Sequence, residues 1–347
     1  MILFHNDYSE GCHASVLDAL VKTNMEQTPG YGEDKYCAAA ADKIKQSCGR
    51  EDLDVHFLVG GTQANLIVIT AALRPHQGVI CADSGHVNVH ETGAIEATGH
   101  RVIGLPSREG KITGRQVTEY VKAHYADPSF EHTVQPGMVY ISNPTEWGTL
   151  YSKAELEELS VVCRTEGLYL FVDGARLGYG LTSRESDLTM ADLSNLCDVF
   201  YIGGTKVGAL FGEAVVITNR TLARDFRYIM KQRGGMLAKG RLLGVQFDAL
   251  FTDELYFRIS AHANEMADIL KKQFVDSGYP FFMPPQSNQL FPILPAEVRR
   301  KLAEKYTFIE MDKLDDDLCV CRFCTSWATA EENVRALCAD IAAVTKS

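Results

Sequence analysis

Short apolar runs alternate with longer segments of helical periodicity between residues 55 and 217. The runs typical of strands are VHFLV (55–59), GVICAD (78–83), HRVIGLP (100–106), GMVYIS (137–142), LYLFVD (168–173), DVFYIGG (198–204) and EAVVI (213–217). The segments typical of helices are TQANLIVITAALR (62–74), VNVHETGAIEATG (87–99), GRQVTEYVKAHYA (114–126) and SKAELEELSVVCRTEG (152–167). Because repeated strand–helix units build a parallel sheet with helices on both faces, the pattern predicts a three-layer α/β/α fold with a mainly parallel sheet.

The pattern changes near residue 245, where long helical stretches replace the alternation. Residues 239–274 are predicted to be helical, short strands are expected near 281–294 and 318–327, and residues 330–344 predict a last helix. We therefore expect a large domain over 1–245 and a smaller C-terminal α/β domain over 246–347. The opening residues, up to about residue 20, could pack with either domain.

Composition excludes several classes of protein. The chain has 347 residues, of which 46% are hydrophobic and 23% charged, enough for a sizeable core. Its net charge of -11 argues against a nucleic-acid or membrane-surface binder, because both need a positive face. No run approaches the roughly 18 consecutive apolar residues that span a bilayer. An anionic ligand must therefore be held by a few local basic groups.

Cysteine usage indicates a reducing compartment. The 10 cysteines are scattered, and the opening MILFHNDYSEG lacks the basic and apolar regions of a signal peptide, so we expect a cytoplasmic protein. Cys319, Cys321 and Cys324 resemble part of a metal site, but no second ligand pair stands at the required spacing. The segment LCVCRFC alternates like a strand, so no metal site is predicted.

Lys206 is the first candidate for chemistry. It lies between glycine-flanked turns that separate two apolar runs, in DVFYIGGTKVGALFGEAVVI (198–217). Glycines at such places allow close approach to the backbone. A lysine that is partly desolvated there has a lowered pKa, and its neutral amine can form a Schiff base. The alternative is a solvated lysine in an ordinary turn.

Asp173 is the second candidate, because it ends the apolar run LYLFVD just before Gly174 and Arg176. A buried carboxylate needs a cationic partner. A protonated pyridine nitrogen is such a partner, and pairing it with Asp keeps pyridoxal phosphate an electron sink. The alternatives are a helix cap or an ion pair with Arg176.

The turn at Gly60, Gly61 and Thr62 is the third candidate, since it joins a strand to a helix. Backbone N–H groups at a helix start bind phosphate, and Thr62 and Gln63 would add side-chain donors. The turn matches neither the Walker pattern nor the dinucleotide fingerprint.

His86 follows a further strand, one helical turn before His90 and Glu91. The two histidines could bind a metal, but without a third ligand a ring stacked on a planar cofactor, or a core histidine, is favoured. A phosphate turn, an aromatic ring, a strand-end Asp and a glycine-flanked Lys on one parallel sheet together fit a pyridoxal-phosphate site.

At these residues the chain resembles the low-specificity L-threonine aldolases, which are fold-type-I pyridoxal-phosphate enzymes with aspartate-aminotransferase-like architecture. The resemblance extends over nearly the whole chain. It is densest at YGED (31–34), GGTQAN (60–65), GHVNVHETGA (85–94), DGARL (173–177), GGTK (203–206) and VCRFCTSWATAEENV (320–334).

The resemblance implies a role for each matching residue. Lys206 would bond the cofactor, Asp173 would pair with the ring nitrogen, and His86 would stack on the ring. Gly61 and Thr62 would hold the phosphate, and Arg176 would contact the cofactor near its phenolic oxygen.

The resemblance also implies substrate and subunit contacts. Arg322 would bind the substrate carboxylate with its guanidinium fork. Tyr31 would enter a neighbouring subunit's site in a homodimer or homotetramer.

The chain departs from the family pattern at three places. Asn6 precedes Asp7 where many members have Ser, so an amide would make the carboxylate contact there. His90 precedes Glu91 where many have Tyr. Glu146 and Trp147, in ISNPTEWGTLYS, stand where many have a His that lies over the β-carbon side of the substrate.

The expected reaction is cleavage of L-threonine, L-allo-threonine or a related β-hydroxy-α-amino acid to glycine and an aldehyde. Arg322 and Asn6 would fix the carboxylate, and the base for the β-hydroxyl would be Glu146, His86, His90 or an ordered water. A β-eliminating pyridoxal-phosphate lyase would share every cofactor residue and release ammonia and a keto acid. A non-catalytic binding protein, or a nucleotide-binding α/β protein, remains a third alternative.

Overall fold

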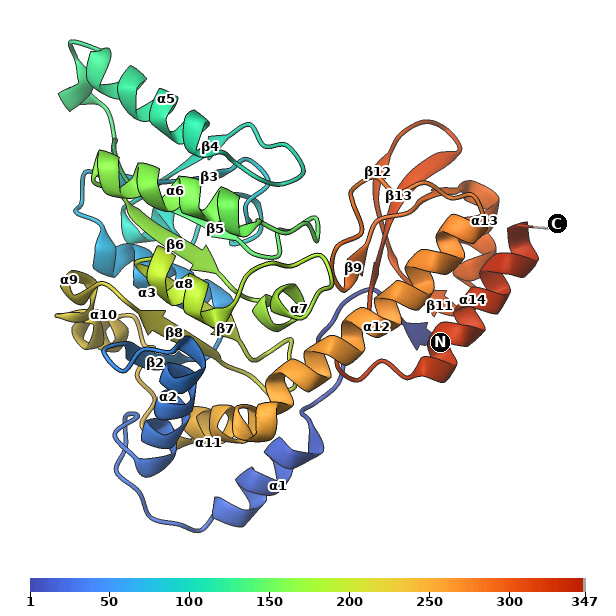
Figure 1. Cartoon of the computed structure of the whole chain (residues 1–347), viewed down its shortest axis with the longest axis horizontal. Helices are drawn as coiled ribbons and strands as arrows, with labels where there is room; N and C mark the ends of the chain where they lie inside the picture. Colours follow the sequence, from blue (N-terminus) through green and yellow to red (C-terminus); the bar gives the residue numbers. More distant parts are fainter. Residues whose placement is uncertain (346–347) are drawn as a thin grey trace.

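The computed structural model describes residues 1–345, and a seven-stranded sheet forms its centre (Figure 1). The strand order is β2 (Asp54–Leu58), β8 (Glu213–Ile217), β7 (Val199–Gly203), β6 (Tyr169–Asp173), β5 (Gln135–Ser142), β3 (Gln77–Ala82) and β4 (Arg101–Leu105). Strand β8 pairs antiparallel with both of its neighbours, whereas the other pairings are parallel. The predicted fold, three-layer α/β/α with a mainly parallel sheet, is confirmed.

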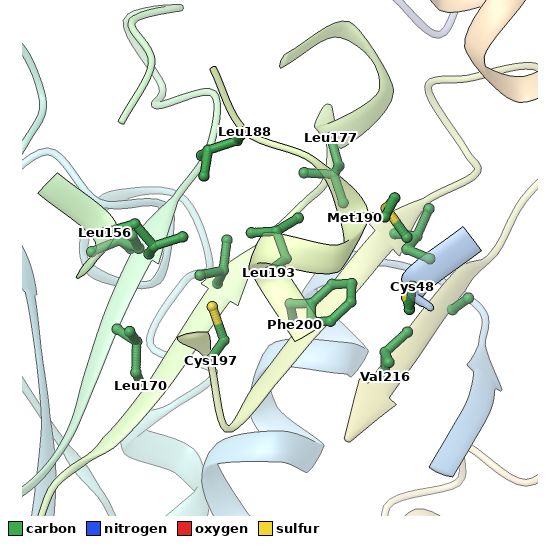
Figure 2. Packing of buried hydrophobic residues seen from close by; sticks show 14 of the residues in the cluster. Cys48, Leu156, Leu170, Leu177, Leu188, Met190, Leu193, Cys197, Phe200 and Val216 are labelled. Atoms are coloured by element: carbon green, nitrogen blue, oxygen red, sulfur yellow. The ribbon is translucent and has the colours of Figure 1, made fainter. Parts of the chain in front are cut away.

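Helices cover both faces of this sheet. One face packs against α2 (Lys35–Cys48), α5 (Gly114–Ala126), α6 (Lys153–Glu166), α8 (Met190–Leu196) and α11 (Arg241–Leu250). The other face packs against α3 (Gly61–Ala72), α9 (Arg220–Ala223) and α10 (Phe226–Gln232). Figure 2 shows part of the first core, where Leu156, Leu193 and Phe200 are among the packed side chains. Burial of such apolar surface is the main stabilising contribution to the fold.

Local signals in the sequence set the ends of two covering helices. Helix α5 begins with a capping box between Thr113 and Gln116, and α6 begins with one between Ser152 and Glu155. Helix α6 ends at Gly167, which has φ 71° in the left-handed region that glycine adopts without strain. These ends agree closely with the predicted helices at 114–126 and 152–167.

The predicted helix over 87–99 is wrong. The structure has only the short helix α4 (His86–Val89) and the 3₁₀ turn η1 (Glu96–Thr98), with turns between them. Thr92 and Gly93 have φ values of 53° and 71°, which no α-helix contains. Helix α4 ends before Glu91, whose carboxyl group contacts the ring of His86 in the site described below.

A second, smaller sheet lies at the C-terminal end of the chain, with the order β10 (Ile293–Pro295), β13 (Leu318–Cys324) and β12 (Ile309–Lys313). Strand β9 (Gln289–Leu290) also pairs with β13. The helices α13 (Ala296–Leu302) and α14 (Glu331–Thr345) belong to this part of the molecule, on the right of Figure 1. The long helix α12 (Leu255–Asp276) runs between the two parts.

Helix α12 contributes to both cores, so the domain boundary at residue 245 stays a prediction. Its first half packs with the large sheet through Tyr256 and Ala263, and its second half packs with the small sheet through Leu270 and Phe274. The N-terminal strand β1 (Ile2–Leu3) pairs with β11 (Tyr306–Thr307) in the C-terminal part. Helix α1 (Ala14–Thr23) instead contacts α11 beside the large sheet.

The remaining short elements are η2 (Phe130–His132), α7 (Leu177–Leu181) and η3 (Thr252–Glu254). Within residues 1–345, no helix combines the length and the apolar character needed to cross a membrane. The three cysteines of β13, at 319, 321 and 324, are buried and unpaired.

Candidate active site

A cavity of about 370 Å³ lies at the edge of the large sheet where the carboxyl ends of its parallel strands meet; we call it the central cavity. It brings together seven of the residues predicted to form the site: Gly61, Thr62, His86, Glu146, Asp173, Arg176 and Lys206. They come from segments spread over more than a hundred residues, because they follow or end five different strands of the same sheet, namely β2, β3, β5, β6 and β7.

Lys206 lies in the turn after β7, and its side chain is half-buried. Burial lowers the pKa of Lys206, and the nearby Arg176 guanidinium lowers it further, while the carboxyl groups of Asp7 and Asp173 oppose the shift. The structure therefore favours the neutral amine of Lys206 more than a solvated turn would. That neutral form is the one that can attack a carbonyl carbon.

Asp173 is the last residue of β6 and is buried. Its Oδ2 accepts hydrogen bonds from the hydroxyl of Tyr140 at 2.5 Å and from Nδ2 of Asn65 at 3.1 Å, and its Oδ1 accepts one from the N–H of Ala175 at 2.9 Å. Burial alone would raise the pKa of Asp173, but the charge of His86 and the hydrogen bonds outweigh it and lower the pKa. Asp173 is thus held as a carboxylate that faces a cavity.

His86 is oriented by a buried carboxylate. Its Nδ1 lies 2.8 Å from Oε1 of Glu91, and the same oxygen accepts a hydrogen bond from Nδ2 of Asn65 at 2.7 Å. Burial alone would lower the pKa of His86, but Glu91 and Asp173 outweigh it and raise the pKa. Asn65 connects Glu91 to Asp173, so the ring and the strand-end carboxylate belong to one hydrogen-bond network.

Glu146 lies in the loop after β5, with Oε1 at 2.6 Å from Oγ of Ser142 and 2.9 Å from the backbone nitrogen of His86. Burial raises the pKa of Glu146, although these hydrogen bonds oppose the shift. A carboxylate with a raised pKa that accepts two hydrogen bonds in a cavity has the properties of a general base.

Arg176 forms a bidentate ion pair with Asp7, with Nε at 2.6 Å from Oδ2 and Nη2 at 3.0 Å from Oδ1. Asn288 donates a further hydrogen bond to Oδ2 of Asp7 at 2.9 Å. Burial alone would raise the pKa of Asp7, but Arg176 and Lys206 outweigh it and lower the pKa. Asp7 therefore connects the N-terminal segment to Arg176, which lines the central cavity, whereas the substrate contact of Asn6 stays a prediction.

The start of α3 forms one wall of the central cavity. Gly60 is its N-cap residue, and no side chain within the described residues caps the helix there. The first-turn N–H groups are therefore available to a ligand, and the helix dipole favours an anion. A Cβ atom on Gly61 would lie 3.0 Å from the hydroxyl of Tyr201, so the backbone approaches the sheet closely at this point.

A second cavity of about 510 Å³, the outer cavity, adjoins the central cavity through Lys206, Glu146 and His86, which line both. Arg322, on β13, lines the outer cavity. Its Nη2 donates to the carbonyl oxygen of His5 at 3.2 Å, whereas its Nε is buried without a hydrogen-bond partner among the described residues.

Three of the predicted residues lie outside both cavities. The side chain of Gln63 accepts a hydrogen bond from the N–H of Val59 at 3.3 Å. Asn6 accepts hydrogen bonds from Tyr8 and Ser9 within its own loop. Tyr31 is 45% exposed, and the ammonium group of Lys231 lies 4.6 Å from the centre of its ring.

Sequence reasoning missed several residues of the site. Asn65 lies in the motif GGTQAN and Glu91 in GHVNVHETGA, but only the fold shows that Asn65 contacts Asp173 and that Glu91 contacts His86. The sequence indicates no role for Asp7 beyond its place next to Asn6. Glu213 is the first residue of β8, the antiparallel strand of the large sheet, and it lines the central cavity. The rule that ligands bind at the carboxyl ends of parallel strands does not indicate the first residue of an antiparallel strand. Across residues 1–345, no group of three or more potential metal ligands is found.

Comparison with known proteins gives consistent matches. The family model described as beta-eliminating lyase matches residues 6–296. A low-specificity L-threonine aldolase of Pseudomonas sp. (strain NCIMB 10558) is 34% identical, over 98% of this chain and 97% of the relative. A second, from Pseudomonas aeruginosa, is 30% identical over 97% of this chain and 96% of the relative.

Solved structures agree with the sequence matches. A threonine aldolase of Leishmania major superposes with a TM-score of 0.96 and 46% identity, covering 99% of this chain and 100% of that one. An aspartate aminotransferase of Thermus thermophilus superposes with a TM-score of 0.71 at 16% identity, covering 99% of this chain and 91% of that one, which shows the shared fold.

Proposed function

Because the chain belongs to the beta-eliminating lyase family, we propose that it cleaves L-threonine, L-allo-threonine or a related β-hydroxy-α-amino acid to glycine and an aldehyde. It is a fold-type-I carbon–carbon lyase with pyridoxal phosphate as its cofactor. The observation that carries the proposal is the meeting of Lys206 and Asp173 in one cavity, in a chain 46% identical to a threonine aldolase of known structure.

The residues of the central cavity fit this cofactor. The uncapped start of α3 offers N–H groups to a phosphate, and a side chain on Gly61 would crowd Tyr201. Asp173 is held as a carboxylate, as a protonated ring nitrogen requires. Lys206, whose pKa is lowered, supplies the amine that bonds the cofactor. The donor set thus matches the three ends of the cofactor, which are phosphate, ring nitrogen and aldehyde.

When bound, pyridoxal phosphate would supply an electron sink for carbon–carbon cleavage. Asp173 would pair with its ring nitrogen and hold that nitrogen protonated. His86, oriented by Glu91, lies in the same cavity and would cover one face of the ring. Arg176, already paired with Asp7, keeps a fixed positive charge beside Lys206.

Arg322 would bind the substrate carboxylate, because it lines the outer cavity and its Nε has no hydrogen-bond partner among the described residues. Glu146 lines both cavities, so we propose that it accepts the proton of the substrate's β-hydroxyl group. Ser142 and the backbone of His86 hold its Oε1 in place. His90, which also lines the outer cavity, has a pKa lowered by burial and by the charges of His86 and Arg322.

A β-elimination is the second candidate, since the family takes its name from this reaction. The two reactions can be distinguished by the products that they form from L-threonine. The proposed cleavage gives equal amounts of glycine and acetaldehyde, whereas elimination gives ammonia and a keto acid. Ammonia formed in the amount of substrate consumed, with no glycine, would replace the aldolase proposal by the lyase.

Assembly and location extend the proposal. A homodimer or homotetramer would let Tyr31 enter a neighbouring subunit's site, and the exposure of its ring beside Lys231 supports this arrangement. The cysteines of the described residues form no disulfide, which supports a location in the reducing cytoplasm. Sedimentation velocity would measure the assembly state.

A further inference from the structure

Glu213 is a buried carboxyl group of the central cavity that has no task in the reaction described above. It is 4% exposed and is the first residue of β8, where it lies opposite Leu58 of β2 and Gly203 of β7. Because β8 runs against its neighbours, its first residue lies at the edge where their carboxyl ends meet. The antiparallel strand therefore brings a carboxyl group into the cofactor cavity.

Glu213 shares this cavity with the Gly60–Thr62 turn. Its strand partner Leu58 is two residues before Gly60, so β8 places Glu213 next to the strand that leads into the turn that would hold the cofactor's phosphate. A phosphate group carries nearly two negative charges at neutral pH. A carboxylate beside it would be repelled strongly, because charges inside a protein are less screened than charges in water.

The basic groups of the central cavity are committed to other partners. Arg176 forms its bidentate pair with Asp7, and His86 contacts Glu91. Lys206 is the residue that bonds the cofactor in the proposed reaction. Among the described residues that line the cavity, no other Lys, Arg or His is present. An ionised Glu213 would have no free cation of this chain beside it once the cofactor is bound.

Burial of Glu213 favours its neutral form and outweighs the contacts that favour the ionised form. One of these contacts is the hydrogen bond that its Oε2 accepts from the backbone N–H of Gly204 at 3.2 Å. Burial raises the pKa of Glu213 to about 8; Thr205 and Lys206 oppose this shift, and Asp173 adds to it. The other ionisable groups around it come from neighbouring elements, namely Tyr201, Tyr256, Arg176 and His86. Glu213 is therefore largely protonated at neutral pH.

We propose that Glu213 is a cofactor-binding residue that acts as a neutral acid and donates a hydrogen bond to the phosphate held at the Gly60–Thr62 turn. The proposal rests on the proposed cofactor site. Binding of the phosphate and ionisation of Glu213 oppose each other. Under alkaline conditions binding takes up one proton, which passes from solvent to the Glu213 carboxylate and leaves every bond of the cofactor unchanged. Cofactor affinity should therefore fall as the solution becomes alkaline.

The test measures binding of pyridoxamine 5′-phosphate to the cofactor-free protein across a range of pH. This ligand has an amine in place of the aldehyde, so it forms no bond with Lys206. For the wild type, the dissociation constant should rise by up to about tenfold per pH unit above the pKa of Glu213. Glu213→Gln keeps a hydrogen-bond donor of the same shape but cannot ionise, so it should lack the part of this rise that comes from Glu213. Deprotonation of the ligand's ring nitrogen affects both proteins alike. Pyridoxamine, which lacks the phosphate, should bind both proteins with the same pH dependence.

A second measurement counts protons. Calorimetric titration of both proteins with pyridoxamine 5′-phosphate, in buffers of different ionisation heat, should show that the wild type takes up nearly one proton per ligand more than Glu213→Gln does above the pKa of Glu213. Equal pH dependence or equal proton uptake in the two proteins would overturn the role of Glu213 and leave the cofactor site standing. Failure of both proteins to bind the ligand at any pH would overturn the cofactor site as well.

Discussion

Asp173 and Glu146, two carboxyl groups of the central cavity, have different hydrogen-bond partners. These partners shift their pKa values in opposite directions and so suit them to different roles. Asp173 receives hydrogen bonds from Tyr140 and Asn65 and lies near the charge of His86, so its pKa is lowered despite burial. Glu146 is only partly exposed, its hydrogen-bond partners do not offset the effect of burial, and its pKa is raised. Environments that separate the pKa values of neighbouring acids are typical of enzymes that use one as a fixed charge and another as a base.

Replacing Glu146 by Gln should remove the proposed base. We expect kcat/KM for L-threonine to fall by about a hundredfold, the lower range for loss of a positioned general base. A base acts in its ionised form, so wild-type activity should be lost as the pH falls through the raised pKa of Glu146. The pH profile of kcat/KM in Glu146→Gln should lack that acidic limb.

Ser142→Ala is the matched control, because it removes a donor to Glu146 and keeps the carboxyl group. Loss of this hydrogen bond should raise the pKa of Glu146 further, so the acidic limb should move to higher pH while the plateau rate is largely kept. An unchanged acidic limb in Glu146→Gln would transfer the role of base to His86, His90 or water.

At the scale of elements, the predictable features were those with strong local signals. The strands that end in Ser142, Asp173 and Gly203 are uninterrupted apolar runs, and their order along the chain indicates a parallel sheet. Once that sheet is expected, the meeting of Lys206 with Asp173 follows from the rule for strand ends. The predicted helix over 87–99 is wrong because Thr92 and Gly93 adopt left-handed backbone geometry, which an α-helix does not contain and which the helical pattern did not reveal.

The start of α3 provides an element-scale test of the phosphate site. Gly61→Ala should place a Cβ 3.0 Å from the Tyr201 hydroxyl and push the first turn of α3 away from the cavity. We expect the dissociation constant for pyridoxal phosphate to rise severalfold or more, because the N–H groups must point at the phosphate. Equilibrium dialysis with the cofactor-free protein measures this constant.

Gly60→Ala adds a Cβ at the neighbouring position of the same turn. This Cβ meets nothing of the chain within 4 Å, and the φ of -175° is extended backbone that any residue adopts. Because Gly60 lines the central cavity, a loss of affinity in this variant would come from contact with the ligand and not from a clash within the protein. Wild-type affinity in Gly61→Ala would mean that the turn does not hold the phosphate in the way described.

At the scale of the whole molecule, the site depends on contacts between distant parts of the chain. Asp7 reaches the large-sheet residue Arg176 and also binds Asn288, which precedes the small sheet. These contacts depend on tertiary packing, so no local pattern around Asp7 could reveal them. Glu213 was missed for a similar reason, since its position depends on the one strand that runs against the sheet.

Asp7→Asn should leave the buried guanidinium of Arg176 without its counterion. We expect the free energy of unfolding at neutral pH to fall by about 3–5 kcal/mol, as is typical when one partner of a buried ion pair is removed. The pKa of Asp7 is lowered in the folded protein, so its contribution is present above its ordinary pKa and is lost as the pH falls. Urea denaturation at neutral pH measures the change.

The double variant Asp7→Asn with Arg176→Met is the control, because it removes the stranded charge as well. It should recover part of the lost stability. A single variant as stable as the wild type would show that the N-terminal segment does not depend on this ion pair.

The most direct test of the central claim is aldehyde release from L-threonine and L-allo-threonine by the protein loaded with pyridoxal phosphate, with Lys206→Ala measured beside it. We predict that the wild type releases acetaldehyde with an equal amount of glycine, and that the variant does not turn over while it still binds the cofactor weakly through its phosphate. Full activity in Lys206→Ala, or no cleavage of either isomer by the loaded wild type, would contradict the account.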